Sequence, residues 1–177
     1  MTPQEEQRLK DRFVNANPYA ANGFKVALRN NPLYADNISR QVILSIHNDW
    51  RNKMSELSLK YNRTQALDTF LTDVCELKSF MNERHTASFK ADGFKFSHAQ
   101  KSFSVFLKYR WCQGHIVAPP TCPIDRGVLK KLGRPYRTWN WTQMQECQFL
   151  STYIKLQREA ERNDLSVAQM ELQWFGN

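Results

Sequence analysis

Hydrophobic residues recur at helical spacing along much of the chain. Between positions 36 and 57 they fall three or four residues apart, at Ile38, Val42, Ile43, Ile46, Trp50, Met54 and Leu57. That spacing matches one face of an α-helix, so the pattern predicts an amphipathic helix there. The same spacing predicts a second helix over 67–81, from the positions of Leu67, Phe70, Leu71, Val74, Leu77, Phe80 and Met81. The polar tripeptide at 62–64 separates the two helices.

Helix-start signals place the remaining elements. Segments 97–100, 142–145 and 166–169 each read Ser or Thr, two residues, then Gln. This is the capping box, in which the two side chains bind each other's backbone amides, so a helix is expected to open at each segment. Thr2 before Pro3 predicts a first helix that ends near residue 14. Asp125 predicts the cap of a short helix over 126–132.

These elements predict an all-α fold, and no segment alternates as a strand does. The stretch 15–34 contains Asn-Pro and Asn-Gly pairs, which favour turns, so we expect it to be largely loop. The length of 177 residues suits one domain. We therefore expect a compact helical domain of about six to seven helices, with an N-terminal helix and loop at 1–34 and the core at 35–177.

Composition and charge narrow the class of protein. Lys and Arg number 25 against 17 Asp and Glu, and the net charge of +8 favours a polyanionic partner such as nucleic acid. No stretch approaches the roughly 18 apolar residues of a membrane-spanning helix. The polar N-terminus does not resemble a secretory signal, so we expect a cytoplasmic protein. In that compartment Cys75, Cys112, Cys122 and Cys147 would be reduced thiols.

Two helix starts carry residues that suggest chemistry. Segment 99–107 reads Ala-Gln-Lys-Ser-Phe-Ser-Val-Phe-Leu, and segment 122–133 reads Cys-Pro-Ile-Asp-Arg-Gly-Val-Leu-Lys-Lys-Leu-Gly. They resemble the two core motifs of the helix-hairpin-helix DNA glycosylases. In that family one helix begins Lys-Thr, and a later Pro-x-Asp segment opens another helix. Here Lys101 and Ser102 match the first motif, and Asp125 matches the aspartate of the second.

The chain departs from the family pattern in two ways. The glycine-rich hairpin that usually precedes the lysine is replaced by Phe-Lys-Phe-Ser-His at 94–98, and the gap between lysine and aspartate is longer. Both departures make the chain more similar to the archaeal-type 8-oxoguanine glycosylases. No cysteine cluster near the C-terminus suggests an iron–sulfur centre, so we expect no cofactor.

The resemblance implies a DNA N-glycosylase, either with AP-lyase activity or, if Lys101 stays charged, as a monofunctional enzyme that uses Asp125 and water. Asp125 would stabilise positive charge at the sugar C1′, and Lys101 would attack that carbon as an unprotonated amine. Lys108, seven residues further on, and His98, three residues earlier, would disfavour a charged Lys101. The excised base would be an oxidised guanine or a hypermodified phage base, in DNA repair or in antiviral defence.

Aromatic and basic residues near these helix starts are candidates for holding double-stranded DNA with one base flipped out. The predicted substrate-binding residues are Phe94, His98, Trp111, Tyr136, Trp139 and Trp141. The predicted DNA-binding residues are Lys95, Lys108, Arg110, Arg126, Lys130, Lys131, Arg134 and Arg137. The aromatic residues also fit an ordinary core, and the cations also fit an ordinary solvated face.

Other interpretations of the same residues stay open. Asp125 also fits a plain helix cap, and Lys101 a solvated lysine, in which case the chain would be a non-enzymatic module that binds nucleic acid or protein. A metal alternative takes Cys112, His115 and Cys122 as zinc ligands, with Cys147 or His98 as the fourth, although their spacing fits no common zinc motif. We expect a monomer.

Overall fold

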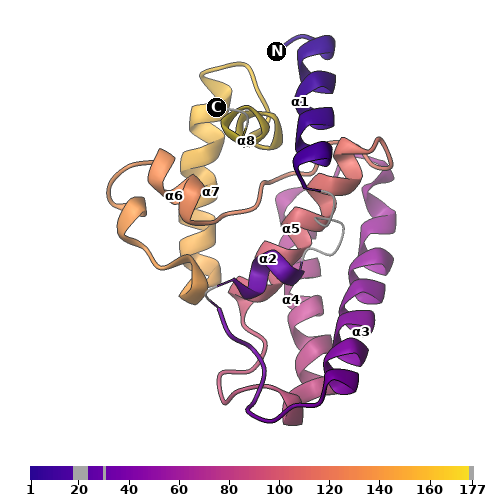
Figure 1. Cartoon of the computed structure of the whole chain (residues 1–177). Coiled ribbons are helices and arrows are strands. Elements are labelled where there is room, and N and C mark those ends of the chain that lie inside the picture. Colours follow the sequence, from indigo (N-terminus) through magenta and orange to yellow (C-terminus); the bar gives the residue numbers. More distant parts are fainter. Residues whose placement is uncertain (18–23, 30, 176–177) are drawn as a thin grey trace.

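The computed structural model describes residues 1–17, 24–29 and 31–175. Eight α-helices and no strand lie within these residues, which confirms the all-α class. The helices are α1 (Pro3–Ala16), α2 (Phe24–Leu28), α3 (Arg40–Ser58), α4 (Leu67–His85), α5 (Phe96–Cys112), α6 (Arg126–Lys131), α7 (Glu146–Glu161) and α8 (Val167–Phe175) (Figure 1). Short 3-10 turns occupy Leu59–Asn62, Thr86–Ser88, Tyr136–Thr138 and Trp141–Gln143.

Helix α5 lies at the centre of the molecule, between the α3–α4 pair and the C-terminal helices (Figure 1). Every residue of α5 is buried except Arg110, which is half-buried. Phe103 of α5 and Phe149 of α7 both stack on Phe70 of α4, with ring centroids 5.9 and 5.8 Å from that of Phe70. A helix covered on all sides has no solvated face, so its polar residues must find partners inside the protein.

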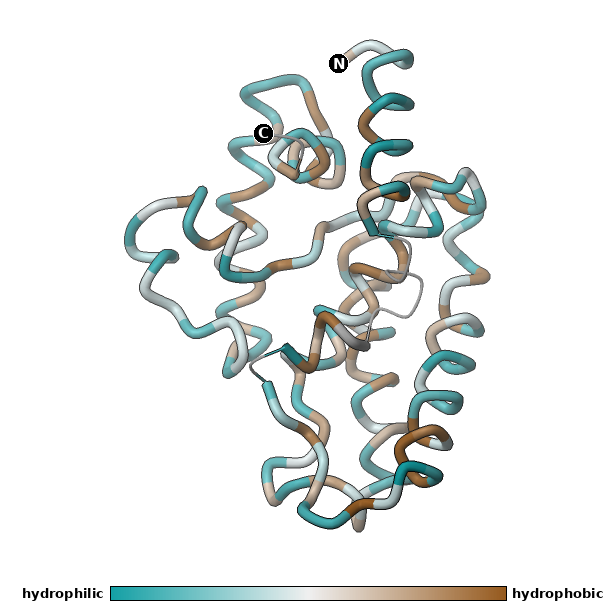
Figure 2. The backbone as a smooth tube through the Cα atoms, in the orientation of Figure 1, coloured by the Kyte–Doolittle hydropathy of each residue, from teal (hydrophilic) through white to brown (hydrophobic). Residues whose placement is uncertain are grey.

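The two periodic segments form the long helices α3 and α4, as the spacing predicts. The buried residues of α3 are Ile46, Trp50, Met54, Leu57 and Ser58, and α4 buries the predicted apolar face apart from half-buried Leu67 and Phe80. Helix α3 begins later than expected, because the Ser39 hydroxyl accepts a hydrogen bond from the Val42 amide and caps it. Near its start, in a segment with hydrophobic residues (Figure 2), Val42 and Leu44 are exposed.

Two of the predicted capping boxes are wrong. Helix α5 begins two residues early, with Lys95 as its N-cap and the Lys95 amide donating to Nδ1 of His98. Ser97 lies inside the first turn, where its hydroxyl donates to the carbonyl of Thr142 at 2.8 Å and accepts from the side-chain amide of Asn31. Helix α7 is capped by Gln145 and Gln148 rather than from residue 142. The predicted cap at Thr2 and the predicted box that opens at Ser166 are present.

The predicted loop at 15–34 is also partly wrong, since helix α1 runs to Ala16 and the short helix α2 lies within that stretch. Helix α2 packs against α5, where Ala27 is fully buried, so tertiary contact rather than a local signal holds this five-residue helix. The prediction for residues 18–23 and 30 lies outside the described residues.

Residues 125–141 form a lobe beside α7, which we call the basic lobe. It contains α6 and the turn Tyr136–Thr138 (Figure 1). Helix α6 ends as predicted at Gly133, whose φ of 73° is a conformation that other residues rarely adopt. The guanidinium of Arg126 donates to the Arg137 carbonyl at 2.7 Å and ties the helix to the turn. The lobe therefore contains little regular secondary structure, and this hydrogen bond connects its two parts.

Candidate active site

Lys101 and Asp125 meet where the centre of the fold joins the basic lobe. Nζ of Lys101, on α5, lies 2.6 Å from Oδ2 of Asp125, the residue that caps α6. The other carboxylate oxygen, Oδ1, accepts hydrogen bonds from the amides of Gly127 and Val128, at 2.8 and 3.1 Å. One oxygen thus anchors the side chain to the helix, and the other is directed at the lysine.

This pair is charged and partly open to solvent. Burial raises the pKa of Asp125, but the Lys101 ammonium and the two α6 amides outweigh burial and lower the pKa below its usual value. The Lys101 side chain is 8% exposed and that of Asp125 is 38% exposed. A molecule in solvent can therefore approach the carboxylate directly, while most of the lysine lies beneath it.

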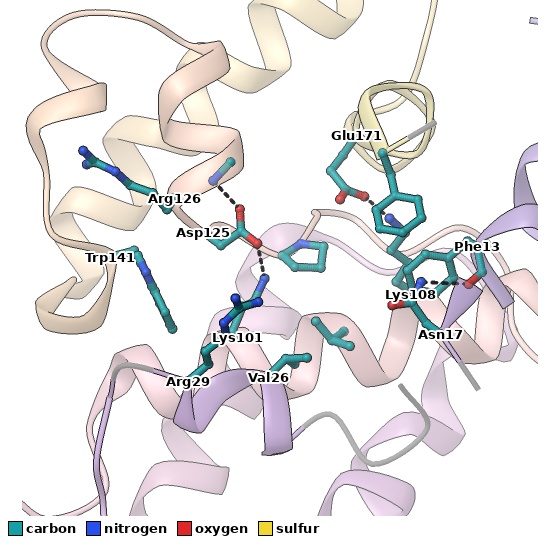
Figure 3. A pocket seen from close by; sticks show the side chains of 14 residues that line it. Phe13, Asn17, Val26, Arg29, Lys101, Lys108, Asp125, Arg126, Trp141 and Glu171 are labelled. Atoms are coloured by element: carbon teal, nitrogen blue, oxygen red, sulfur yellow. Dashed lines mark hydrogen bonds and ion pairs between the residues drawn. The ribbon is translucent and has the colours of Figure 1, made fainter. Parts of the chain in front are cut away.

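The pair lines a cavity of about 480 Å³ between α1, α2, α5, α8 and the basic lobe (Figure 3). Trp141 and Arg126 form its wall on the side of the lobe, and Arg29 and Val26 border it below Lys101 in the view of Figure 3. The cavity is mixed in character, with apolar walls and charged groups at a few points. Ligand sites in proteins usually have this composition.

A second ion pair lies at the opposite end of the same cavity. Nζ of Lys108 lies 2.6 Å from Oε2 of Glu171 on α8, and their side chains are 4% and 12% exposed. The rings of Phe13 and Phe175 enclose the ammonium, with centroids 4.2 and 4.8 Å away. Lys108 therefore lies paired inside the cavity, and not on an exposed surface with the other predicted DNA-binding cations.

His98 also differs from its prediction. It is fully buried, Nδ1 accepts from the Lys95 amide, and Nε2 lies 3.0 Å from the carbonyl of Asn31. Burial lowers the pKa of His98 to about 4, so the ring is neutral at pH 7. It therefore neither lines the cavity nor adds a positive charge beside Lys101.

The predicted aromatic residues separate into three groups. Trp141 lines the cavity. Phe94 is fully buried against Trp50, and Trp111 is buried under Lys10 at a different pocket between α1 and the end of α5, so neither reaches the cavity. Tyr136 and Trp139 form an edge-to-face pair on the basic lobe, with centroids 5.1 Å apart.

Five of the predicted DNA-binding residues are exposed on the basic lobe: Arg126, Lys130, Lys131, Arg134 and Arg137. None of the five forms an ion pair with another described residue. Lys95 and Arg110 are half-buried and do not line the cavity; the Arg110 guanidinium lies 6.0 Å from the Phe106 ring centroid. The lobe thus gathers cations that remain available to anions.

The structure gives the zinc alternative no support. His115 is exposed, whereas Cys112 and Cys122 are buried, and burial raises the pKa of both thiols, that of Cys112 to about 12. Across residues 1–17, 24–29 and 31–175, no three His, Cys, Asp or Glu side chains converge as metal ligands.

Sequence reasoning missed the cavity's far end, which is built by Phe13, Glu171 and Phe175. The signals for them were weak. Lys108 follows Lys101 by two helical turns, and Glu171 is the single charged residue of the otherwise largely apolar helix α8. Nothing local connects Lys108 with a carboxylate 63 residues away.

Comparison with known proteins identifies no relative. No protein-family model matches the chain, and neither a curated protein nor a solved structure matches it. None of the helices in the described part of the chain has the length and apolar character needed to cross a membrane.

Proposed function

We propose that this protein is a DNA N-glycosylase with AP-lyase activity, and that Lys101 and Asp125 are its catalytic residues. The observation that carries the proposal is the 2.6 Å contact between Lys101 Nζ and Asp125 Oδ2 inside a 480 Å³ cavity. A solvated surface lysine would be largely exposed. The Lys101 side chain is instead 8% exposed and contacts a carboxylate that already caps a helix. The resemblance to the helix-hairpin-helix glycosylases points to the same two residues.

The two groups divide the chemistry of base removal. As the bond between C1′ and the base nitrogen breaks, its electron pair leaves with the base, and the Lys101 ammonium protonates that base. The carboxylate of Asp125 stabilises the positive charge that develops at C1′. The Lys101 amine then bonds to C1′, and transfer of a proton from nitrogen to O4′ opens the sugar ring and leaves a Schiff base.

The rest of the cavity suits a flipped base. Its volume lies within the range of roughly 300–1,000 Å³ found for small-molecule sites. Trp141 offers an aromatic surface for stacking. Lys108 and Glu171 supply one donor and one acceptor for the edge of a base, which an oxidised guanine or a modified phage base would present.

The basic lobe is the proposed contact with the DNA backbone. All five cations are exposed on the lobe, and one of them, Arg126, also lines the cavity. Such cations bind phosphates without reading sequence, and the binding weakens as salt increases. Specificity would come from the cavity instead.

The test is borohydride trapping on duplex DNA that carries oxidised guanine, hypermodified phage bases or other altered bases in turn. Borohydride reduces a Schiff base to a stable protein–DNA adduct. We expect an adduct with at least one substrate, and none with Lys101→Gln. Base release that survives in Lys101→Gln but is lost in Asp125→Asn would show a water-dependent glycosylase instead. No adduct and no base release from any duplex, with DNA binding unaffected by either substitution, would favour the non-enzymatic module.

A further inference from the structure

Gln100 directly precedes Lys101 on α5 and is fully buried. Its side-chain amide Nε2 donates a hydrogen bond of 3.0 Å to the backbone carbonyl of Ile124. Ile124 is the residue before Asp125, and it is fully buried as well. Two successive residues of α5 therefore hold two successive residues of the other segment, one through the backbone and one through the carboxylate.

We propose that Gln100 is a positioning residue, which fixes Asp125 relative to Lys101. The proposal rests on the function proposed above. The Ile124 carbonyl and the Asp125 amide belong to one planar peptide unit, so a bond that holds the carbonyl also holds the Cα from which the carboxylate extends. Residues 121–125 form no helix, which leaves their placement dependent on contacts with α5 and the core.

The pair's geometry makes such an anchor useful. Asp125 is held by α6 through Oδ1 and by Lys101 through Oδ2, and both of those contacts use the same carboxylate. A catalytic cycle in which Lys101 leaves the ion pair to bond with C1′ would remove one of them. The Gln100 amide acts on the backbone instead, so it keeps the carboxylate in place after the lysine has moved.

The chain offers a matched control one helical turn away. Ser104 is buried on the same side of α5 as Gln100, and its hydroxyl has no hydrogen-bond partner among the described residues. Gln100→Met keeps the length of the side chain and removes the donor, whereas Ser104→Ala removes a buried polar group that holds nothing. The two variants separate positioning from the general effect of changing a buried polar residue.

The first measurement is single-turnover trapping on a duplex that gives an adduct in the borohydride test above, together with DNA affinity. We expect Gln100→Met to slow adduct formation by about 100-fold, the cost of a misplacement of about 1 Å, and to leave DNA affinity unchanged. Ser104→Ala should match the wild type in both. Equal trapping rates in Gln100→Met and the wild type would overturn the proposal.

The second measurement needs no substrate, so it distinguishes failure of this inference from failure of the proposed function. The Asp125 carboxyl is titrated by carbon NMR in the free protein, where it faces the Lys101 ammonium and the amides of Gly127 and Val128. We expect its pKa to rise toward the usual value in Gln100→Met and to stay low in Ser104→Ala. An unchanged titration in a folded Gln100→Met variant would show that Gln100 only stabilises the fold. Should Gln100→Met not fold, Gln100→Asn draws the amide back by one carbon, and the same two outcomes apply.

Discussion

The two lysine–carboxylate pairs on α5 have the same contact distance, 2.6 Å, and opposite surroundings. Asp125 is 38% exposed and anchored by two backbone amides, so the Lys101 pair opens toward solvent. Lys108 lies between two phenylalanine rings, and both members of its pair are largely enclosed. Seven residues of one helix thus separate an accessible pair from a covered one.

The difference shows how two similar ion pairs in one cavity can take different tasks. A partly exposed carboxylate next to a lysine can be reached by a substrate more readily than an enclosed one. Charges enclosed among apolar groups are expensive to separate, so the Lys108 pair fixes the shape and polarity of its end of the cavity. On the proposed function, reaction belongs to the open pair and recognition to the enclosed one.

The largest expected effect is on activity, from the open pair. Asp125→Asn removes the charge that stabilises C1′, and base release should fall by roughly 1,000-fold. Asparagine caps helices about as well as aspartate, so α6 should stay folded. Single-turnover base release, with the unfolding midpoint as the control, measures this. Activity near the wild-type level would show that Asp125 is not catalytic, and the two ion pairs would then not differ in function.

The next effect is on stability, from the enclosed pair. Lys108→Met leaves Glu171 buried without its cation and should lower the free energy of unfolding by about 3 kcal/mol. Lys101→Met leaves Asp125 exposed and still bound by the α6 amides, so about 1 kcal/mol or less is expected. Urea unfolding of both variants gives the two values. Equal losses of unfolding free energy in the two variants would contradict the difference in burial between the pairs.

A third measurement, of the free energy of unfolding against pH, distinguishes the contribution of buried His98 from that of the two ion pairs. Burial lowers the pKa of His98 to about 4, so between pH 6.5 and 4 the unfolded chain binds a proton that the folded protein does not. Stability should therefore fall by up to about 3 kcal/mol as pH drops through that window. Urea unfolding across pH should show a weaker slope there in His98→Gln. A slope identical to that of the wild type would assign the pH dependence to other groups.

The Lys101–Asp125 pair should affect stability at lower pH than His98 does. The folded pKa of Asp125 is depressed, so its stabilisation is complete above the unfolded value near 4 and is lost as pH falls through the lower, folded value. Comparing Asp125→Asn with the wild type should give a stability difference that disappears in strong acid. A difference that vanishes between pH 6.5 and 4 instead would contradict a lowered Asp125 pKa.

The smallest effect concerns DNA affinity and leaves both pairs intact. Lys130→Gln and Lys131→Gln should weaken binding severalfold for any sequence and reduce the dependence of log affinity on log salt by about 0.9 for each phosphate that is no longer neutralised. Lys78→Gln, at an exposed position on α4, is the control that should change neither. Fluorescence anisotropy at several salt concentrations checks both. A weakening no greater than that in Lys78→Gln would exclude the basic lobe as the DNA surface.

Regular parts of the fold follow from the sequence because their signals are local. The faces of α3 and α4 appear in the spacing of apolar residues, and Asp125 and Gly133 delimit α6 as expected. Helix α5 was harder, because a helix buried on every side has no polar stripe. Its polar residues looked like surface residues, although Ser97 and His98 bind buried carbonyls.

The site was predictable only where a motif existed. Lys101 and Asp125 are brought together, while their catalytic role stays a prediction. Glu171, Phe13 and Phe175 come from the two ends of the chain, and no spacing rule relates them to α5. The basic lobe was predicted from its composition, whereas Lys108 in the same set is enclosed, because charge in a sequence does not report burial.

The rigidity of α5 has a consequence for the size of ligand the cavity accepts. Lys101 and Lys108 extend from one helix and stand seven residues apart, which is about 10 Å along the axis. Since α5 is covered on all sides, the distance between the two positions on the helix cannot adjust to a ligand. The helix therefore sets a fixed length: a molecule shorter than this interval reaches one ion pair or the other, and only one of matching length reaches both.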